Sequence, residues 1–184
     1  LIGIGGMGQV HEAWQIPLER GVAVKRSKGK GGTNSNGKML IREGRLLACL
    51  EHPNVPPVHI LGIDEDERAV LVMKRIRGDT WLALLQDPSH PRWSEVHTNR
   101  QIGGIKTLIQ VARALEFAHS KGILHRDIKT ENIMVGDFGQ VYLLDWGLAA
   151  ELDDHGKVVA SKFSGTPAYA APEMVHKREN LTPL

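Results

Sequence analysis

The stretch HRDIKTEN, residues 125–132, places one imidazole, two cations, two carboxylates and one amide within eight positions. It follows a segment with helical periodicity, and the residues after it, IMV at 133–135, predict a short strand. The stretch matches the pattern H-R-D-x-x-x-x-N, which puts Asp127 and Asn132 five residues apart. It therefore predicts a loop of closely spaced polar and charged residues between a helix and a strand.

Two shorter motifs follow in the same half of the chain. A turn at GDFGQ, residues 136–140, and a second strand at VYLL, residues 141–144, lead to Asp145-Trp146-Gly147. The tripeptide APE, residues 171–173, comes next. One motif of this size is only a hypothesis, whereas several in a fixed order are specific.

The N-terminus, LIGIGGMGQV, has the spacing G-x-G-x-x-G at Gly3, Gly5 and Gly8, with an extra glycine at Gly6. A dinucleotide-binding fingerprint needs a strand before these glycines and a helix after them. Only two residues precede Gly3, and the segments after Gly8 predict two strands. A Walker A loop is excluded because neither lysine nor a hydroxyl residue follows Gly8. This segment alone leaves two interpretations open: a phosphate-binding turn between strands, or a loop at a chain end.

Lys25 and Glu43 predict an ion pair. Lys25 lies in the expected strand GVAVKR, residues 21–26, among apolar residues. Residues 38–50 predict a helix with Glu43 on its apolar side. That side is expected to carry Met39, Leu46, Leu47 and Leu50. A carboxylate among apolar residues is costly unless a cation reaches it, and Lys25 is the candidate cation.

The remaining patterns predict an upper part made of a sheet with one helix and a lower part that is mainly helical. VHILGI (58–63) and AVLVMK (69–74) predict a hairpin, and residues 81–86 a short helix before two prolines. A longer helix ends at Gly122. Its expected buried side comprises Ile105, Leu108, Ile109, Ala112, Leu115 and Ala118. Residues 74–78 are the expected hinge.

Composition adds few constraints. The 184 residues are 41% hydrophobic and 24% charged, which predicts an ordinary globular chain. A net charge of +2 gives no reason to expect nucleic acid as a partner. Cys49 is the only cysteine, which favours a reducing compartment. No run is apolar enough for a membrane segment, so a cytoplasmic protein is expected, with an anchor beyond Leu184 left open. The nine histidines show no zinc-site spacing.

With these motifs in order, the chain resembles the eukaryotic-like protein kinases from Gly3 to Glu173. HPNVPPVHILG (52–62) and GTPAYAAPE (165–173) are most similar to their bacterial serine/threonine branch. The resemblance implies an α+β, bilobal fold. Residues 1–77 would form an N-lobe with an antiparallel sheet and one helix, and residues 78–184 a partial, mainly helical C-lobe with the catalytic and activation loops.

The resemblance also implies roles for individual residues. Asp127 would accept the proton of the substrate hydroxyl, and Lys129 would contact the γ-phosphate of ATP. Asn132 and Asp145 would bind Mg²⁺, a hard cation that prefers oxygen ligands. The implied ATP-binding residues are Ile2, Gly3, Gly5, Gly6, Gly8, Val10, Ala23, Lys25, Glu43, Met73, Arg75, Ile76 and Met134. Each apolar member of this set is also a plausible core residue.

In this family the arginine at Arg126 pairs with a phosphorylated activation loop. Candidate acceptors are Ser161, Ser164 and Thr166, with Thr166 better suited to the substrate-binding turn. Two positions depart from the family pattern. Trp146 replaces a phenylalanine and predicts altered packing, and Thr130 stands where proline is common. The family's helices after APE would lie beyond Leu184, and without them the lower lobe is expected to lack part of its core.

The expected function is that of an ATP-dependent protein serine/threonine kinase with Mg²⁺ as its cofactor and a protein as its substrate. Autophosphorylation of the activation loop, and self-association for it, are open expectations. The alternative is a catalytically silent, pseudokinase-like fragment that binds a nucleotide or a partner. A small-molecule phosphotransferase of related fold is disfavoured by HRDIKTEN and GTPAYAAPE.

Overall fold

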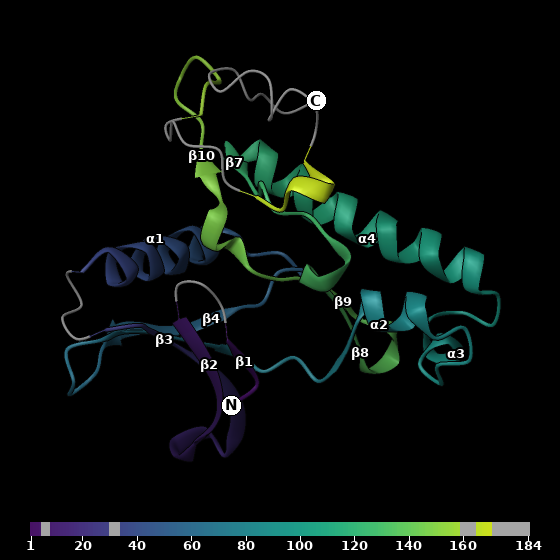
Figure 1. Ribbon diagram of the computed structural model, residues 1–184, viewed down its shortest axis with the longest axis horizontal. Coiled ribbons are helices and arrows are strands. Elements are labelled where there is room, and N and C mark those ends of the chain that lie inside the picture. The colour runs from purple at the N-terminus through teal and green to yellow at the C-terminus, as the bar shows by residue number, and fades with distance from the viewer. Residues whose placement is uncertain (5–7, 30–33, 159–164, 171–184) are drawn as a thin grey trace. The chain divides into compact units, whose positions relative to one another are not determined.

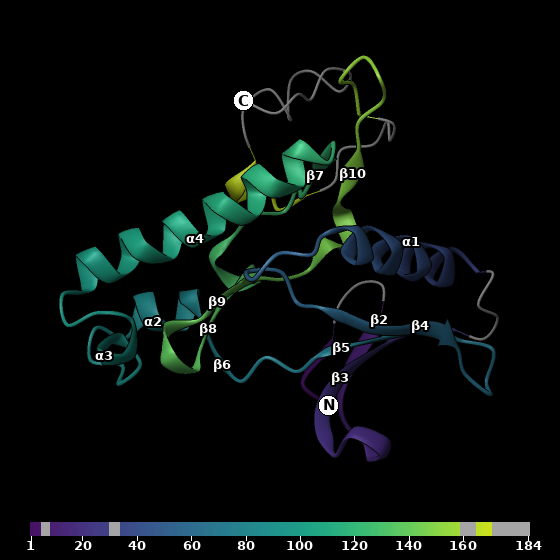
Figure 2. The same ribbon diagram turned by 180° about the vertical axis from the view of Figure 1, so that it is seen from behind.

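The computed structural model describes residues 1–4, 8–29, 34–158 and 165–170. The chain forms two compact units. The first comprises Leu1–Glu51 and Pro56–Ile76, and the second His52–Val55 and Arg77–Leu184. Figures 1 and 2 show the elements of each unit from opposite sides. The content of sheet and helix confirms the predicted α+β class.

A five-stranded antiparallel sheet forms most of the first unit. Its strands are β1 (Gly3–Ile4), β2 (Gly8–Gln15), β3 (Arg20–Ser27), β4 (Val58–Ile63) and β5 (Ala69–Lys74), in the spatial order β1-β2-β3-β5-β4. A 3-10 turn, η1 (Ile16–Leu18), connects β2 to β3. The predicted hairpin of β4 and β5 is confirmed. Its acidic turn is closed by Asp64, whose side chain accepts the N–H groups of Asp66 and Arg68 at 3.0 and 2.9 Å.

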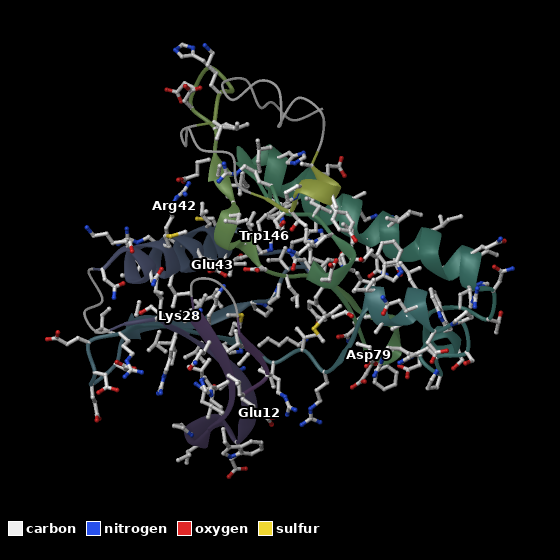
Figure 3. All side chains as sticks on the ribbon, in the orientation of Figure 1. Glu12, Lys28, Arg42, Glu43, Asp79 and Trp146 are labelled. Atoms are coloured by element: carbon white, nitrogen blue, oxygen red, sulfur yellow. The ribbon has the colours of Figure 1, made fainter. Side chains whose placement is uncertain are left out.

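Helix α1 (Ser35–Cys49) packs against this sheet and begins three residues before the predicted start. Asn34 caps it by accepting the N–H of Gly37 at 2.7 Å. Its buried side includes Leu40, Leu46 and Leu47, together with Glu43. The prediction for Met39 is wrong, since Met39 is 39% exposed and the adjacent Leu40 takes the buried position. In Figure 3, Glu43 lies on the side of α1 that faces the sheet and Arg42 on the other side.

The second unit combines helices with two small sheets. Its helices are α2 (Trp81–Gln86), α3 (Trp93–Val96) and α4 (Arg100–Ser120). Strands β6 (Gly78–Thr80), β8 (Ile133–Gly136) and β9 (Val141–Leu143) form one sheet, and β7 (Ile123–Leu124) pairs with β10 (Ala150–Glu151). The short 3-10 turns are η2 (Thr130–Asn132), η3 (Asp137–Gly139), η4 (Trp146–Leu148) and η5 (Pro167–Tyr169). The core side chains include Leu84, Ile133, Val135, Val141, Leu143 and Trp146.

Helix α4 confirms the predicted helix, but most of its predicted buried side is wrong. Ile105, Leu108 and Ile109 are 57, 51 and 47% exposed. Ala112 is also exposed and Leu115 is half-buried, so that only Ala118 of the predicted set is buried. The observed buried side consists of Gly103, Thr107, Val111, Ala114 and Ala118. At Gly103 the helix lies close to the Trp93 ring, since a Cβ there would be in van der Waals contact with the ring at 3.4 Å.

Residues 52–55 belong to the second unit although they lie between α1 and β4 in sequence. The Asn54 amide donates hydrogen bonds to the Val141 carbonyl at 2.8 Å and to Gln110 Oε1 at 3.0 Å. The His52 ring stacks on Phe117 with the ring centres 5.5 Å apart. The two units therefore do not separate at a single point of the chain. Within the described part of the chain, none of the helices has the length and apolar character needed to span a membrane.

Candidate functional site

Lys25 and Glu43 form the predicted ion pair in the first unit. Lys25 Nζ donates hydrogen bonds to both carboxylate oxygens, at 2.7 and 2.8 Å. The side chains are only 10 and 3% exposed. Strand β3 places Lys25 opposite Val10 on β2 and Leu71 on β5. A charge among such neighbours needs a partner, because an isolated buried ion costs several kcal/mol. The pair therefore holds the ammonium group at a defined place on the sheet.

The strand register brings several of the predicted ATP-binding residues onto the same face as Lys25. Ala23 pairs with Met73 on β5, and Val10 pairs with Lys25 itself. Directly paired residues share a face of the sheet, and so do residues two apart in a strand. Ile2 is tied to this group because its N–H donates to the Val10 carbonyl at 2.9 Å.

The other predicted ATP-binding residues lie in several different elements. Gly3 pairs with Val10 across β1 and β2. Arg75 and Ile76 directly follow β5, whereas Met134 lies on β8 in the second unit. Gly5 and Gly6 lie outside the described residues.

Gly8 is required by the sheet itself. A Cβ at this position would lie 2.3 Å from the carbonyl oxygen of Arg26 on the paired strand. No side chain fits at that distance. Any residue other than glycine at this position would strain the backbone of β3. The glycine spacing predicts phosphate binding at Gly8 but does not indicate this packing constraint.

A second ion pair on this face, between Glu12 and Arg75, was not predicted. Glu12 is directly paired with Ala23, so it shares the face of Val10 and Lys25. The guanidinium of Arg75 contacts the Glu12 carboxylate. Alternation along β2 places Glu12 on the Val10 face, but a partner beyond the end of β5 could be found only in three dimensions.

In the second unit, His125 and Asn132 shape the predicted catalytic loop. His125 is buried, its Nδ1 accepts the Asp127 N–H at 3.2 Å and its Nε2 donates to the Leu144 carbonyl at 2.9 Å. Arg126, at φ 66°, supplies the sharp bend between them. Asn132 donates to the Asp127 carbonyl at 2.8 Å and to Asp127 Oδ2 at 3.0 Å. These bonds fix the carboxylate of Asp127 from both ends of the loop.

The Asp127 carboxylate also meets a lysine and a threonine hydroxyl. Lys129 Nζ lies 2.9 Å from Oδ2, and Thr166 Oγ1 donates to Oδ1 at 2.7 Å. Lys129 donates in turn to Thr166 Oγ1 at 2.8 Å. A carboxylate, an ammonium group and an alcohol therefore form a closed triangle of hydrogen bonds. Thr130, the departure from the family's proline, contacts the Tyr169 hydroxyl at 3.1 Å and links the same two segments.

Protonation states in this cluster follow from its contacts. Burial raises the pKa of the Asp127 carboxyl, but the hydrogen bonds from Lys129, Thr166 and Asn132 outweigh burial and leave that pKa lowered. The hydrogen bond to Asp127 raises the pKa of Lys129. Burial lowers the pKa of His125. At neutral pH the loop therefore presents an ionised aspartate, a charged lysine and a neutral histidine.

Asn132 and Asp145 have the donor atoms that the predicted Mg²⁺ site requires. Because the Asn132 amide nitrogen faces Asp127, its amide oxygen points away from that residue. The Leu144 N–H donates to the Asn132 carbonyl at 2.7 Å, which keeps the adjacent Asp145 beside the catalytic loop. One carboxylate and one amide oxygen suit a hard cation that retains part of its water shell.

Trp146 packs in the core next to Asp145. It is 1% exposed, its indole N–H donates to the Leu143 carbonyl at 3.0 Å, and its ring meets His125 edge-on. A second Asp-x-Gly sequence, Asp137-Phe138-Gly139, has a different environment. Phe138 is 90% exposed, and Asp137 pairs with Arg92 on the surface. Burial thus distinguishes the motif at residue 145 from the turn at residue 137.

The predicted activation-loop residues are covered only in part. Ser161, Ser164 and the APE tripeptide lie outside the described residues. Thr166 is described, and its hydroxyl contacts Asp127 and Lys129. Arg126 Nε donates to the Leu148 carbonyl at 2.7 Å, which places its side chain near the start of the activation loop.

Comparison with curated proteins finds bacterial relatives. The serine/threonine-protein kinase PknD of Protochlamydia amoebophila is 32% identical over 94% of this chain. PknD of Chlamydia felis is 35% identical over 94%. PknD of Chlamydia trachomatis serovar L2b is 32% identical over 94%. The chain spans about a fifth of the length of these relatives, from 20 to 21%.

Comparison with protein families matches residues 1–183 to the family described as the protein kinase domain. The match covers both units, including the Lys25–Glu43 pair and the Asp127 cluster. With this match and the similarity to bacterial serine/threonine kinases, the chain belongs to the protein kinase domain family.

Proposed function

We propose that this chain transfers the γ-phosphate of ATP to serine or threonine hydroxyls of a protein substrate. The observation that carries the proposal is the contact of an ionised Asp127 with an alcohol. Thr166 Oγ1 donates to its carboxylate at 2.7 Å, with the Lys129 ammonium 2.8 Å from the same oxygen. The bacterial relatives are named serine/threonine-protein kinases, which supports the same chemistry.

In the proposed reaction, a substrate hydroxyl donates its proton to Asp127. The hydroxyl oxygen forms a bond to the γ-phosphorus, the bond from that phosphorus to the β,γ-bridging oxygen breaks, and ADP leaves. Lys129 balances the negative charge on the transferred group. A positioned base contributes about 10²–10⁴ to a rate of this kind, and electrostatic stabilisation supplies much of the rest.

The residues of the first unit serve the nucleotide. Lys25 binds the α- and β-phosphates, and Glu43 orients its ammonium group through the two hydrogen bonds described above. Gly3, Gly5, Gly6 and Gly8 let the backbone approach the phosphates because they have no Cβ. The apolar residues Ile2, Val10, Ala23, Met73 and Met134 contact the adenine ring, with Arg75 and Ile76 beside it.

Asn132 and Asp145 would hold Mg²⁺. When bound, it neutralises charge on the phosphate oxygens. The proposal also includes autophosphorylation at Ser161 or Ser164 through self-association and a cytoplasmic site of action. Phosphorylation there would bring about −1.5 to −2 charges near the cation of Arg126.

A phosphotransfer assay with phosphoamino-acid analysis tests this function. The protein is incubated with MgATP labelled in the γ-phosphate and with a mixture of protein substrates, beside Asp127→Asn. We expect phosphoserine and phosphothreonine but no phosphotyrosine, and a loss of about 10²–10⁴-fold in the variant. Nucleotide binding without transfer in either protein would favour the pseudokinase-like alternative. Transfer to an aminoglycoside but to no protein would contradict the proposed substrate class.

A further inference from the structure

The Glu12–Arg75 ion pair lies on the Lys25 face of the sheet, and the function proposed above gives no role to the contact between the two side chains. Arg75 follows β5, whose last ladder residue is Lys74. Residues 75–77 have no regular secondary structure, so main-chain pairing does not hold them to the sheet. The side chain of Arg75 instead reaches back across β3 to Glu12 on β2. Glu12 is labelled on β2 in Figure 3.

The Arg75 side chain passes over Gly21 of β3. A Cβ at Gly21 would lie 3.7 Å from Arg75 Cδ and 3.8 Å from Arg75 Nη1. The arginine stem therefore lies over a glycine of β3, where a large side chain would displace it. The stem is shielded, with the Arg75 side chain 25% exposed and that of Glu12 47% exposed.

The pair stands at one end of a row of predicted nucleotide-binding residues. Glu12, Ala23 and Met73 are consecutive partners across β2, β3 and β5. Lys25 is two residues along β3 from Ala23, on the same face of the sheet. The pair is thus a side-chain contact that ties Arg75, beyond the end of β5, to strand β2, which carries Gly8 and Val10.

We propose that Glu12 and Arg75 are positioning residues for ATP, acting through the backbone of residues 75–76 and strand β2. The inference rests on the proposed function, since it assigns the pair to the nucleotide site. Affinity then depends on the contact between the two side chains and not on the charge of either one. Loss of either partner should raise the dissociation constant and the KM for ATP about threefold to fivefold, the range that a half-exposed ion pair supplies.

Calorimetric titration of the purified protein with MgATP tests the inference, with KM and kcat measured in parallel. The variants are Arg75→Ala, Glu12→Gln and the exchange Glu12→Arg with Arg75→Glu. Arg68→Ala is the matched control. It breaks the ion pair in the β4–β5 turn in which Arg68 Nη2 lies 3.2 Å from Asp66 Oδ2. We expect both single variants to bind ATP about threefold to fivefold more weakly with kcat changed less than about twofold. The exchange should restore affinity, and the control should bind like the parent.

Other outcomes of the titration would overturn the positioning role, the proposed function, or both. If Arg75→Ala weakens binding while Glu12→Gln tightens it, Arg75 contacts the nucleotide by its charge and the inference is wrong. Unchanged affinity in both single variants, or no recovery in the exchange, also overturns it. If the parent binds ATP but transfers no phosphate, the proposed function is wrong. The ATP affinities of the parent and the variants then still show whether Glu12 and Arg75 position the nucleotide. If the parent binds no ATP, both are overturned.

Discussion

Two lysine–carboxylate contacts among the described residues, Lys25–Glu43 and Lys129–Asp127, are built differently. Lys25 and Glu43 come from a strand and a helix 18 positions apart, and both side chains are at most 10% exposed. Lys129 and Asp127 lie in one loop, and Lys129 is 21% exposed. Asn132 and Thr166 share the Asp127 carboxylate. The first contact is part of the packing of its unit, whereas the second belongs to a network of donors around the Asp127 carboxylate.

This difference predicts different failures. Removing one member of a buried pair leaves a charge without compensation, so its main cost is stability. Removing one donor from a shared carboxylate leaves the other donors in place. The main effect is then a change in the orientation of that carboxylate and not a loss of stability.

Glu43→Gln should give the largest loss of stability. It leaves the Lys25 ammonium buried against a neutral amide, and the expected cost is about 3–5 kcal/mol in the free energy of unfolding. Urea unfolding followed by circular dichroism measures it. Arg45→Gln, at an exposed position of the same helix, is the control and should stay within about 0.5 kcal/mol. Equal stability of Glu43→Gln and the parent would show that the pair is not part of the packing.

Thr166→Val should act on the rate instead. It removes the hydroxyl that donates to Asp127 and accepts from Lys129, and hydrogen bonds to charged groups are worth about 1.5–3 kcal/mol. We expect a loss of about 10–100-fold in kcat, with unfolding nearly unchanged. Thr166→Ser keeps the hydroxyl and should retain most of the activity. A parent-like rate in Thr166→Val would remove Thr166 from the network.

Gly8→Ala tests whether the first unit is constrained by packing as well as by ligand binding. The new methyl group would lie 2.3 Å from the Arg26 carbonyl, and overpacking of this kind costs about 1–3 kcal/mol. Thermal unfolding without nucleotide measures the change. Gly62→Ala on β4 is the matched control, because a Cβ there has no neighbour within 4 Å among the described residues. A Gly8→Ala protein as stable as this control would contradict the packing role.

The smallest expected effect is the pH dependence due to His125. Burial lowers its pKa in the folded state, so the unfolded chain binds more protons at acidic pH. The contribution to stability is complete above the ordinary pKa of 6.5 and is lost as pH falls toward the folded value. We expect the free energy of unfolding to decrease between pH 7 and pH 5, and the decrease to be smaller in His125→Gln. An unchanged slope in that variant would mean that other groups cause it.

Much of the site could be predicted because its chemistry is local in sequence. Asp127, Lys129 and Asn132 lie within six positions, and the loop between them closes on itself. The Lys25–Glu43 pair was also predictable, since a lone carboxylate on an apolar helix side requires a cation. The contact of Thr166 with Asp127 was not, because it joins residues 39 positions apart.

The errors in the fold have a common physical cause. The hydrophobic pattern of α4 was assigned to the wrong side because apolar residues were assumed to be buried. The helix instead packs through glycine, alanine and threonine, whose size permits close approach. The same assumption predicted that Met39 is buried, whereas the adjacent Leu40 is the buried side chain. Periodicity thus indicated a helix correctly, while the buried side depended on steric fit that the pattern does not contain.

We propose that Asp127 receives the proton from an acceptor hydroxyl. Intact-mass spectrometry of the protein after incubation with MgATP tests this role directly. The purified protein is first dephosphorylated and then compared with Asp127→Asn under the same conditions. The account predicts added phosphate on the parent and none, over the same time, on the variant. Equal phosphate incorporation by both proteins would contradict it.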